Sequence, residues 1–165
     1  MSAIHAQKSS GGWKALALFV LLTLAVGAVA GVATVSNIQG WYATLNKPSF
    51  NPPNGVFGPV WTLLYILMAI SAWRVWRAPG PEGLRRRALG FWTVQLALNF
   101  AWSFLFFSLQ MPGVALAEIV ALLAALAVTL AVSWRVDRIA GMLLIPYLAW
   151  VAFASLLNFE IWRLN

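Results

Sequence analysis

Two amide side chains and two aromatic side chains lie at regular spacing along one apolar stretch of the sequence. They are Gln95, Asn99, Trp102 and Phe106, separated by four, three and four residues. On a helix that turns about 100° per residue, these spacings keep all four on one face. Because an amide is costly against lipid tails, this stripe is expected to face the interior of a helical bundle. There the amides either hydrogen-bond to neighbouring helices or, with the aromatic rings, line a ligand cavity.

Two more apolar stretches carry comparable stripes. Helical spacing groups Trp61, Tyr65 and Met68 in one of them, and Tyr147, Trp150, Val151, Ala154 and Asn158 in the last. Pro146 is placed to kink that last helix and to free a carbonyl group. Each stripe alone is typical of ordinary core packing. Together, three aromatic inner faces favour a pocket for a flat, largely apolar ligand.

The segment from Trp41 to Trp61 is expected to cover that pocket. It contains four prolines, which fix φ near −65° and bias the preceding residues toward extended conformations, so the segment loses little entropy on ordering. The prolines are Pro48, Pro52, Pro53 and Pro59, and Lys47 is its single charge. We expect an ordered lid over the bundle, packed by its aromatic residues Trp41, Tyr42, Phe50 and Phe57.

The whole chain has the composition of a membrane protein. Of its 165 residues, 62% are hydrophobic and 9% charged, which is too apolar for a solvated surface. A helix needs about 20 mainly apolar residues to cross a bilayer, and five such stretches can be placed at 13–35, 59–76, 84–109, 112–134 and 138–162. The apolar runs do not alternate as the strands of a β-barrel would. The sequence therefore predicts an all-α integral membrane protein: a disordered tail at 1–12, then a single five-helix transmembrane domain at 13–165.

Basic residues predict the orientation of the bundle. All but two of the 11 Lys and Arg residues fall on the side of the N-terminus: Lys8, Lys14, Arg74, Arg77, Arg85, Arg86, Arg87, Arg135 and Arg138. Only Lys47 and Arg163 fall on the other side. By the positive-inside rule, the N-terminus is cytoplasmic in a bacterial plasma membrane, with the lid and the C-terminus outside. Anionic phospholipids account for the net charge of +7 without a nucleic-acid partner.

Several kinds of chemistry lack the residues they need. The chain has no cysteine, and its one histidine, His5, lies in the predicted tail. Neither a disulfide nor a metal site is therefore expected in the bundle, and no cofactor is required. Phosphate-binding, metalloprotease and nucleophile-elbow motifs are absent from the sequence. Ordinary hydrolysis or phosphoryl transfer is not expected.

Small residues and two acids leave alternatives open. Gly27 and Gly31 form a GxxxG pair, and Ala117, Ala121 and Ala125 recur every fourth position. Such faces allow close helix approach, either inside the bundle or between the protomers of a homodimer. Glu118, within a span, either has a functional role, or reaches the interface, or hydrogen-bonds to a neighbouring helix. Glu160 is expected to pair locally with Arg163.

Several of these residues resemble a known family. The lid reads W-Y-x-x-L-x-K-P-x-x-x-P-P, followed by Gly58-Pro59-Val60-Trp61 and Leu64-Tyr65. Further matching segments are Gln95-Leu96-Ala97-Leu98-Asn99, Phe106-Phe107, Pro146-Tyr147-Leu148-Ala149-Trp150 and Leu157-Asn158. In this order, from Trp41 to Asn165, they closely resemble the tryptophan-rich sensory protein family, the TspO/MBR family, which includes the mitochondrial translocator protein. The first span matches only in character.

The resemblance implies a five-helix bundle, often dimeric, with a pocket beneath the first loop for porphyrins, cholesterol-like lipids and benzodiazepine-type ligands. By position, Trp41, Trp61 and Trp150 would line the porphyrin side, with Asn99, Trp102, Ala154 and Leu157 deeper. The family's sterol-recognition pattern in the last helix consists of an apolar residue, a tyrosine and a basic residue. This chain has Leu157 and Arg163 at the first and last of these positions, but Phe159 at the position of the tyrosine. Helical spans favour an inner membrane, although some family members are assigned to outer membranes.

Three functions remain open at this stage. The first is a sensory protein that captures protoporphyrin IX or haem and regulates tetrapyrrole or stress responses. The second is a transporter of porphyrins or other amphipathic molecules, although the sequence has no internal repeat of the kind on which alternating access is commonly built. The third is an enzyme that degrades protoporphyrin in light and oxygen, in which Trp61 and Trp150 would hold the substrate and donate electrons.

Overall fold

A computed structural model describes the backbone from Ser2 and the side chains from Gly12 onward. The regular elements of the described residues are all helices, and these residues contain no strand. The elements are α1 (Ser2–Ile38), α2 (Trp41–Thr44), α3 (Asn54–Arg77), α4 (Glu82–Ser103), the π-helix η1 (Phe104–Ser108), α5 (Pro112–Val136), α6 (Arg138–Leu143) and α7 (Ile145–Leu164). The disordered tail expected at 1–12 falls almost wholly outside the residues whose side chains are described, and it stays a prediction.

Five segments are long and apolar enough to cross a membrane, as the sequence predicted. They are Gly12–Ile38, Asn54–Arg77, Glu82–Ser108, Pro112–Val136 and Arg138–Leu164. Each contains 24 to 27 residues, enough to span roughly 30 Å of hydrocarbon at 1.5 Å per residue. The fold is therefore that of a five-span all-α membrane protein.

The second span begins earlier than expected. We predicted its start at Pro59, because proline is favoured at the first position of a helix. Instead α3 begins at Asn54, directly after Pro53, and Pro59 lies inside it. The extended backbone of Pro53 (φ −55°, ψ 139°) marks the boundary, and a proline in the second turn removes only one backbone donor. The lid is accordingly shorter, and residues 54–58 belong to the helix.

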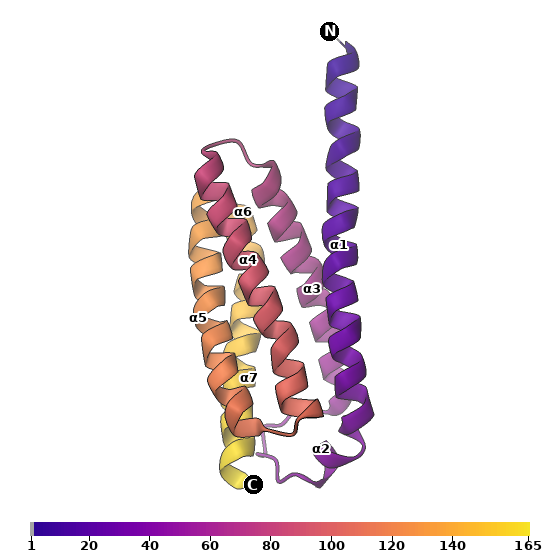
Figure 1. Cartoon of the computed structure of the whole chain (residues 1–165), viewed down its shortest axis with the longest axis vertical. Helices are drawn as coiled ribbons and strands as arrows, with labels where there is room; N and C mark the ends of the chain where they lie inside the picture. Colours follow the sequence, from indigo (N-terminus) through magenta and orange to yellow (C-terminus); the bar gives the residue numbers. More distant parts are fainter. Residues whose placement is uncertain (1) are drawn as a thin grey trace.

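The helices form a bundle in which α1 lies along one side of α3 (Figure 1). The α3–α4 and α5–α6 connections lie at one end of the bundle, while α2, the lid and the C-terminus lie at the other. The arginine-rich connections thus share an end opposite Lys47 and Arg163, in agreement with the charge pattern. Arg163 and Glu160 form the expected local ion pair, with 2.6 Å between Nη2 and Oε2.

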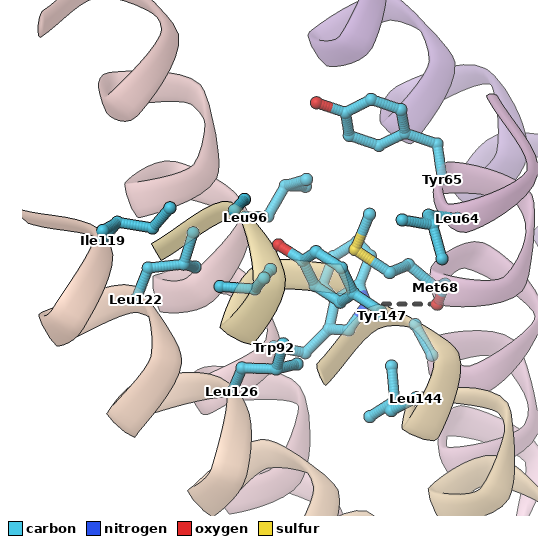
Figure 2. Packing of buried hydrophobic residues seen from close by; sticks show 13 residues of the cluster. Leu64, Tyr65, Met68, Trp92, Leu96, Ile119, Leu122, Leu126, Leu144 and Tyr147 are labelled. Atoms are coloured by element: carbon cyan, nitrogen blue, oxygen red, sulfur yellow. Dashed lines mark hydrogen bonds between the residues drawn. The ribbon is translucent and has the colours of Figure 1, made fainter. Parts of the chain in front are cut away.

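The core lies where α3, α4, α5 and α7 meet. Figure 2 shows Tyr147 of α7 among the packed residues, with Met68 of α3 on one side and Leu96 of α4 on the other. Trp92 ties α4 to α3, because its indole Nε1 donates a hydrogen bond to the Met68 carbonyl at 3.1 Å. This region is tightly packed, whereas the half of the bundle on the lid side is more open.

The last span is interrupted as its proline predicted. α6 ends at Leu143, Leu144 lies between the helices, and α7 starts at Ile145 with Pro146 in its first turn. Proline cannot donate a backbone hydrogen bond into the preceding turn. The break lies six residues before Trp150, the first residue of α7 in the wall of the cavity described below.

Candidate ligand pocket

A cavity of about 590 Å³ lies between α1, α3, α4, η1 and α7, on the lid side of the core. Its wall is formed by Leu24, Gly27, Ala28, Ala30, Gly31, Thr34, Val35 and Ile38 of α1, Tyr42 of α2, Asn54, Gly55, Phe57, Gly58, Trp61, Thr62 and Tyr65 of α3, Asn99, Trp102 and Ser103 of α4, Phe106 and Phe107 of η1, and Trp150, Ala154, Leu157, Asn158 and Ile161 of α7. None of these described residues is charged. The volume lies in the range of about 300–1,000 Å³ typical of small-molecule sites.

Nine of the residues predicted from the sequence meet in this wall: Trp61, Tyr65, Asn99, Trp102, Phe106, Trp150, Ala154, Leu157 and Asn158. Three others do not. Gln95 lies one turn deeper than Asn99 and is fully buried, with its amide nitrogen donating to the Trp92 carbonyl at 2.9 Å. Tyr147 lies one turn deeper than Trp150, in the core. Trp41 packs against Phe106 with ring centroids 5.7 Å apart. A helical stripe predicts the face but not the depth at which packing closes the space.

The amides of the wall are held by hydrogen bonds between helices. The hydroxyl of Tyr65 in α3 donates to Oδ1 of Asn99 in α4. Trp102 Nε1 donates to Oδ1 of Asn158 at 3.0 Å, and Nδ2 of Asn158 donates to the Pro112 carbonyl at 2.8 Å. Both alternatives left open for the stripe are therefore true, because the amides join the helices and also line the cavity.

Two indoles form a corner in the wall. The rings of Trp61 and Trp150 have centroids 6.5 Å apart and planes at 89°. The ring of Trp61 also packs against that of Tyr65, with centroids 5.8 Å apart, and the ring of Phe57, in the first turn of α3, packs against that of Trp150, with centroids 6.0 Å apart. These aromatic pairs restrain one another and present broad apolar faces. The corner suits a flat ligand with a delocalised ring.

The lid lies packed on the bundle by its aromatic residues, as expected. The rings of Tyr42 and Phe107 pack with their centroids 5.6 Å apart, and those of Phe50 and Phe153 with their centroids 6.2 Å apart. The Tyr42 hydroxyl donates to Oδ1 of Asn51 at 2.8 Å, closing the loop on itself. Burial raises the pKa of the Tyr42 phenol above its ordinary value of 10.0, while the hydrogen bond to Asn51 acts to lower it. The phenol therefore stays a neutral donor at physiological pH.

Lys47 and the prolines of the lid shape it without lining the cavity. Pro48, Pro52 and Pro53 lie in the extended stretch between α2 and α3, outside the cavity wall. The ammonium group of Lys47 lies 4.8 Å from the centroid of the Tyr42 ring and donates to the Leu45 carbonyl at 3.1 Å. Its charge thus stabilises the fold of the lid itself.

A pair of asparagines fastens the lid to the end of α7. The backbone N–H of Asn46 donates to Oδ1 of Asn165 at 2.9 Å, and Nδ2 of Asn165 donates to the Asn46 carbonyl at 3.0 Å. Because the side-chain amide pairs with both backbone groups of Asn46, it holds the lid at a defined position. We call this pair the latch.

Replacing Asn165 by alanine is expected to loosen the lid without unfolding the bundle. Its two exposed hydrogen bonds to the lid would be lost, each contributing on the order of 1 kcal/mol, so the lid amides should exchange with deuterium up to about thirtyfold faster. Hydrogen exchange over residues 41–53, followed by mass spectrometry, measures this. Arg163→Ala is the control, because Arg163 pairs with Glu160 and not with the lid. Equal protection in all three proteins would show that the latch does not hold the lid.

α1 contributes more to the site than the sequence predicted. Gly27 and Gly31 were predicted to permit close helix approach, inside the bundle or in a dimer, and both face the interior. A Cβ atom on Gly27 would lie 2.6 Å from Cδ2 of Tyr65 and closer still to Cε2, whereas a Cβ on Gly31 would have no atom within 4 Å. Gly27 therefore provides the space for the Tyr65 ring, and Gly31 widens the cavity. The GxxxG spacing was the signal, but it could not reveal the partner.

The π-helix η1 was not predicted. Its wider turn is seen where the Leu109 N–H donates to the carbonyl of Phe104, five residues back, at 2.8 Å. Phe106 and Phe107 lie in this turn and are buried together against Tyr42 of the lid. No pattern in the apolar segment distinguishes such a turn from a regular helix.

The side chain of Glu118 was expected to have a functional role, to reach the membrane interface, or to hydrogen-bond to a neighbouring helix, and the structure supports neither of the last two alternatives. Both carboxyl oxygens are buried and make no hydrogen bond with the described residues, so the side chain neither reaches the interface nor bonds to a neighbouring helix. The hydroxyl of Tyr147 and the indole Nε1 of Trp150 are likewise buried without a partner. These three polar groups lie on α5 and α7, outside the hydrogen bonds that join the wall.

The sterol pattern of the last helix is not assembled on one surface. Leu157 is buried in the cavity wall, Phe159 is exposed, and Arg163 is paired with Glu160. Residues two apart on a helix, such as Leu157 and Phe159, point about 200° from one another.

Among the side chains described from Gly12 onward, no three His, Cys, Asp or Glu residues lie close enough together to hold a metal ion.

The fold and cavity define a class: a five-span helical membrane protein with a lidded, aromatic-lined small-molecule pocket. Residues 19–163 match the profile of the TspO/MBR family, and the chain belongs to that family. It is 44% identical over 146 residues to the tryptophan-rich protein TspO of Archaeoglobus fulgidus, covering 88% of this chain and 94% of that protein. It is 44% identical over 128 residues to the human translocator protein, covering 76% and 75%. It is 40% identical over 149 residues to the tryptophan-rich sensory protein of Cereibacter sphaeroides, covering 90% and 92%.

Proposed function

We propose that this protein binds a porphyrin, protoporphyrin IX or haem, in the cavity beneath the lid, and that it acts as a membrane sensory protein for tetrapyrrole or stress responses. The observation that carries the proposal is the corner formed by Trp61 and Trp150, whose planes stand at 89° in an uncharged cavity of about 590 Å³. One indole can stack on the face of a flat macrocycle while the other contacts its edge. Sterol-like or benzodiazepine-type ligands would occupy the same apolar space.

Charge supports one orientation of the ligand. The cavity wall offers no cation to a carboxylate among its described residues, and a buried unpaired charge is costly. The propionate groups of protoporphyrin would therefore stay at the lid end, near the exposed start of α3 at Asn54. The apolar edge of the ring would point toward Asn99 and the core.

The same charge reasoning supports a location. We propose that the arginine-rich end faces the cytoplasm of a bacterium and that the lid faces outward from its inner membrane. The cavity would then lie in the half of the membrane away from the cytoplasm, where porphyrin dissolved in the bilayer can reach it. The homodimer implied by the family resemblance stays a prediction.

A titration of the detergent-solubilised protein with protoporphyrin IX in the dark tests the binding proposal. We expect saturable quenching of Trp fluorescence and a matching shift of the porphyrin absorbance, with an apparent Kd in the micromolar range or below. A Trp61→Phe/Trp150→Phe variant should bind several-fold more weakly, because it loses indole contacts. Trp76→Phe/Trp134→Phe is the control, since both indoles are partly exposed outside the cavity.

Other outcomes would point to other functions. Linear quenching, or identical titrations of the cavity variant and the wild type, would mean that the porphyrin merely partitions into micelles, and the proposal would fail. Light-dependent bleaching of bound porphyrin to a new pigment, lost in the Trp61/Trp150 variant, would favour a degrading enzyme. Uptake of porphyrin into sealed proteoliposomes would favour a transporter.

A further inference from the structure

The cavity is open on one side, and the exposed residues of its wall show which side. On α1, Ala28 and Val35 are exposed, and Val35 is 71% exposed. On α3, the exposed wall residues are Asn54, Gly55, Gly58 and Thr62. Every wall residue from α2, α4, η1 and α7 is buried or half-buried. The opening therefore lies between α1 and α3, away from the rest of the bundle.

This opening extends deep along the helices. Thr62 lies eight residues below Asn54, where α3 begins, a depth of about 12 Å at 1.5 Å per residue. Ala28 lies ten residues before the end of α1 at Ile38, about 15 Å by the same measure. Since the hydrocarbon layer is roughly 30 Å thick, the opening reaches well into it. The side chains beside the opening on α1 are exposed and apolar, as for Val32 and Val35, so it faces acyl chains.

The end of the cavity nearest to water is closed by comparison. The latch between Asn46 and Asn165 and the packing of Tyr42 on Phe107 hold the lid over that end. Tyr42, the lid residue in the cavity wall, is buried. A ligand arriving from the aqueous side would have to displace the lid, whereas a ligand in the bilayer would not.

The rim of the opening suits an apolar molecule. Its hydroxyl groups are satisfied within their own helices, because Thr62 donates to the Gly58 carbonyl at 2.9 Å and Thr34 to the Ala30 carbonyl at 3.1 Å. Gly31, Gly55 and Gly58 leave open space beside their backbones. An uncharged ring system can therefore pass without desolvating an unpaired polar group.

We propose that the gap between α1 and α3 is a lateral portal through which flat, apolar, membrane-dissolved molecules pass between the bilayer and the cavity. The proposal rests on the proposed function, because it requires that the cavity binds such a molecule. Below the portal, α1 and α3 are in close contact where Tyr65 packs on Gly27. α1 thus borders the open side of the cavity and closes it from below.

The absence of cysteine from the sequence makes a direct test possible, because a single introduced cysteine is labelled alone. In proteoliposomes, Thr62→Cys and Val35→Cys would each carry a bulky, non-fluorescent maleimide on one rim of the portal. Leu63→Cys, exposed on α3 but outside the cavity wall, carries the same label as the matched control. An Asn46→Cys/Asn165→Cys variant, joined by a short bifunctional thiol reagent, holds the lid shut.

Protoporphyrin IX is bound first in the dark, the label is attached second, and release is followed on dilution into protein-free vesicles. We expect release at least tenfold slower from both rim-labelled proteins, and unchanged from labelled Leu63→Cys and from the locked lid. Displacement of porphyrin by the rim labels, release at the control rate, or slow release from the locked lid would each overturn the portal. Absence of saturable binding in the unlabelled protein would instead refute the proposed function.

Discussion

Replacing Gly27 by alanine is expected to destabilise the protein and to remove ligand binding together. The added Cβ would lie 2.6 Å from Cδ2 of Tyr65, and carbon atoms pack at about 3.5–4.0 Å. Because the carbon would meet a ring at mid-helix, the backbones of α1 and α3 or the ring itself must move. Overpacking of this kind typically costs about 1–3 kcal/mol.

Movement of Tyr65 has a second consequence at the site. Its hydroxyl donates to Asn99, so displacement of the ring leaves a buried carbonyl oxygen in the cavity wall without its donor. An unsatisfied buried group costs roughly a further 1–3 kcal/mol. We expect the melting temperature in detergent to fall by several degrees and the affinity for protoporphyrin IX to fall at least tenfold.

Gly31→Ala is the matched control for this prediction. It adds the same methyl group one turn further along α1, where no atom lies within 4 Å, so the melting temperature should stay near that of the wild type. A Gly27→Ala/Tyr65→Ala variant separates the two effects, because it relieves the overlap but leaves the ring and its hydroxyl absent. Compared with Tyr65→Ala alone, it should lose little further stability, because the overlap is absent, while binding stays weak. Equal melting of Gly27→Ala and Gly31→Ala would contradict the packing argument.

Replacing Asp137 by alanine is expected to have the largest effect at the other end of the bundle. Asp137 lies between α5 and α6, where Oδ1 accepts from the Ala140 N–H at 2.9 Å and caps α6. Oδ2 accepts from Nη2 of Arg74 in α3 at 2.8 Å, and Arg74 Nε donates to Oδ1 at 3.2 Å. One carboxylate thus joins α3 to the α5–α6 junction.

The expected loss has two parts. Removal of an N-cap costs about 1 kcal/mol, and loss of the Arg74 pair adds a contribution on the order of 1 kcal/mol, because its side chains are 31% and 19% exposed and partly screened. Glu82→Ala is the control, since Glu82 and Arg86 form an ion pair with side chains 65% and 80% exposed. Thermal melts in detergent should show a clear loss for Asp137→Ala and almost none for Glu82→Ala. Comparable losses would contradict the capping role.

The contribution of Asp137 should depend on pH in a defined direction. Burial acts to raise the pKa of its carboxyl, but the hydrogen bonds from Arg74, Ala140 and Ile139 and the charge of Arg74 bring it below its ordinary value of 3.8. A group with a lowered folded pKa stabilises the protein above its unfolded pKa, and this stabilisation is lost as pH falls through the folded pKa. The difference in melting temperature between the wild type and Asp137→Ala should therefore be constant from pH 5 to 8 and shrink below about pH 4.

The outline of the fold followed from local sequence properties. Bilayer thickness fixes the length of an apolar helix, so five spans could be recognised without any knowledge of their contacts. Pro146 marked the interruption of the last span because the loss of a backbone donor is a local property. The inward direction of Asn99 and Trp102 also followed, since an amide facing lipid is costly whatever the neighbouring helix.

The pocket itself depended on how the helices meet. Gln95 and Asn99 belong to the same stripe, yet only Asn99 reaches the cavity, because depth depends on the side chains of other helices. The sequence by itself thus determined the five spans, the lid and the aromatic inner faces, for each is set by periodicity or by the bilayer. Only the tertiary structure decided that Gly27 makes room for Tyr65, that η1 widens at Phe106, and that the cavity opens between α1 and α3. These features arise from contacts between residues far apart in the chain, where packing and not local pattern decides.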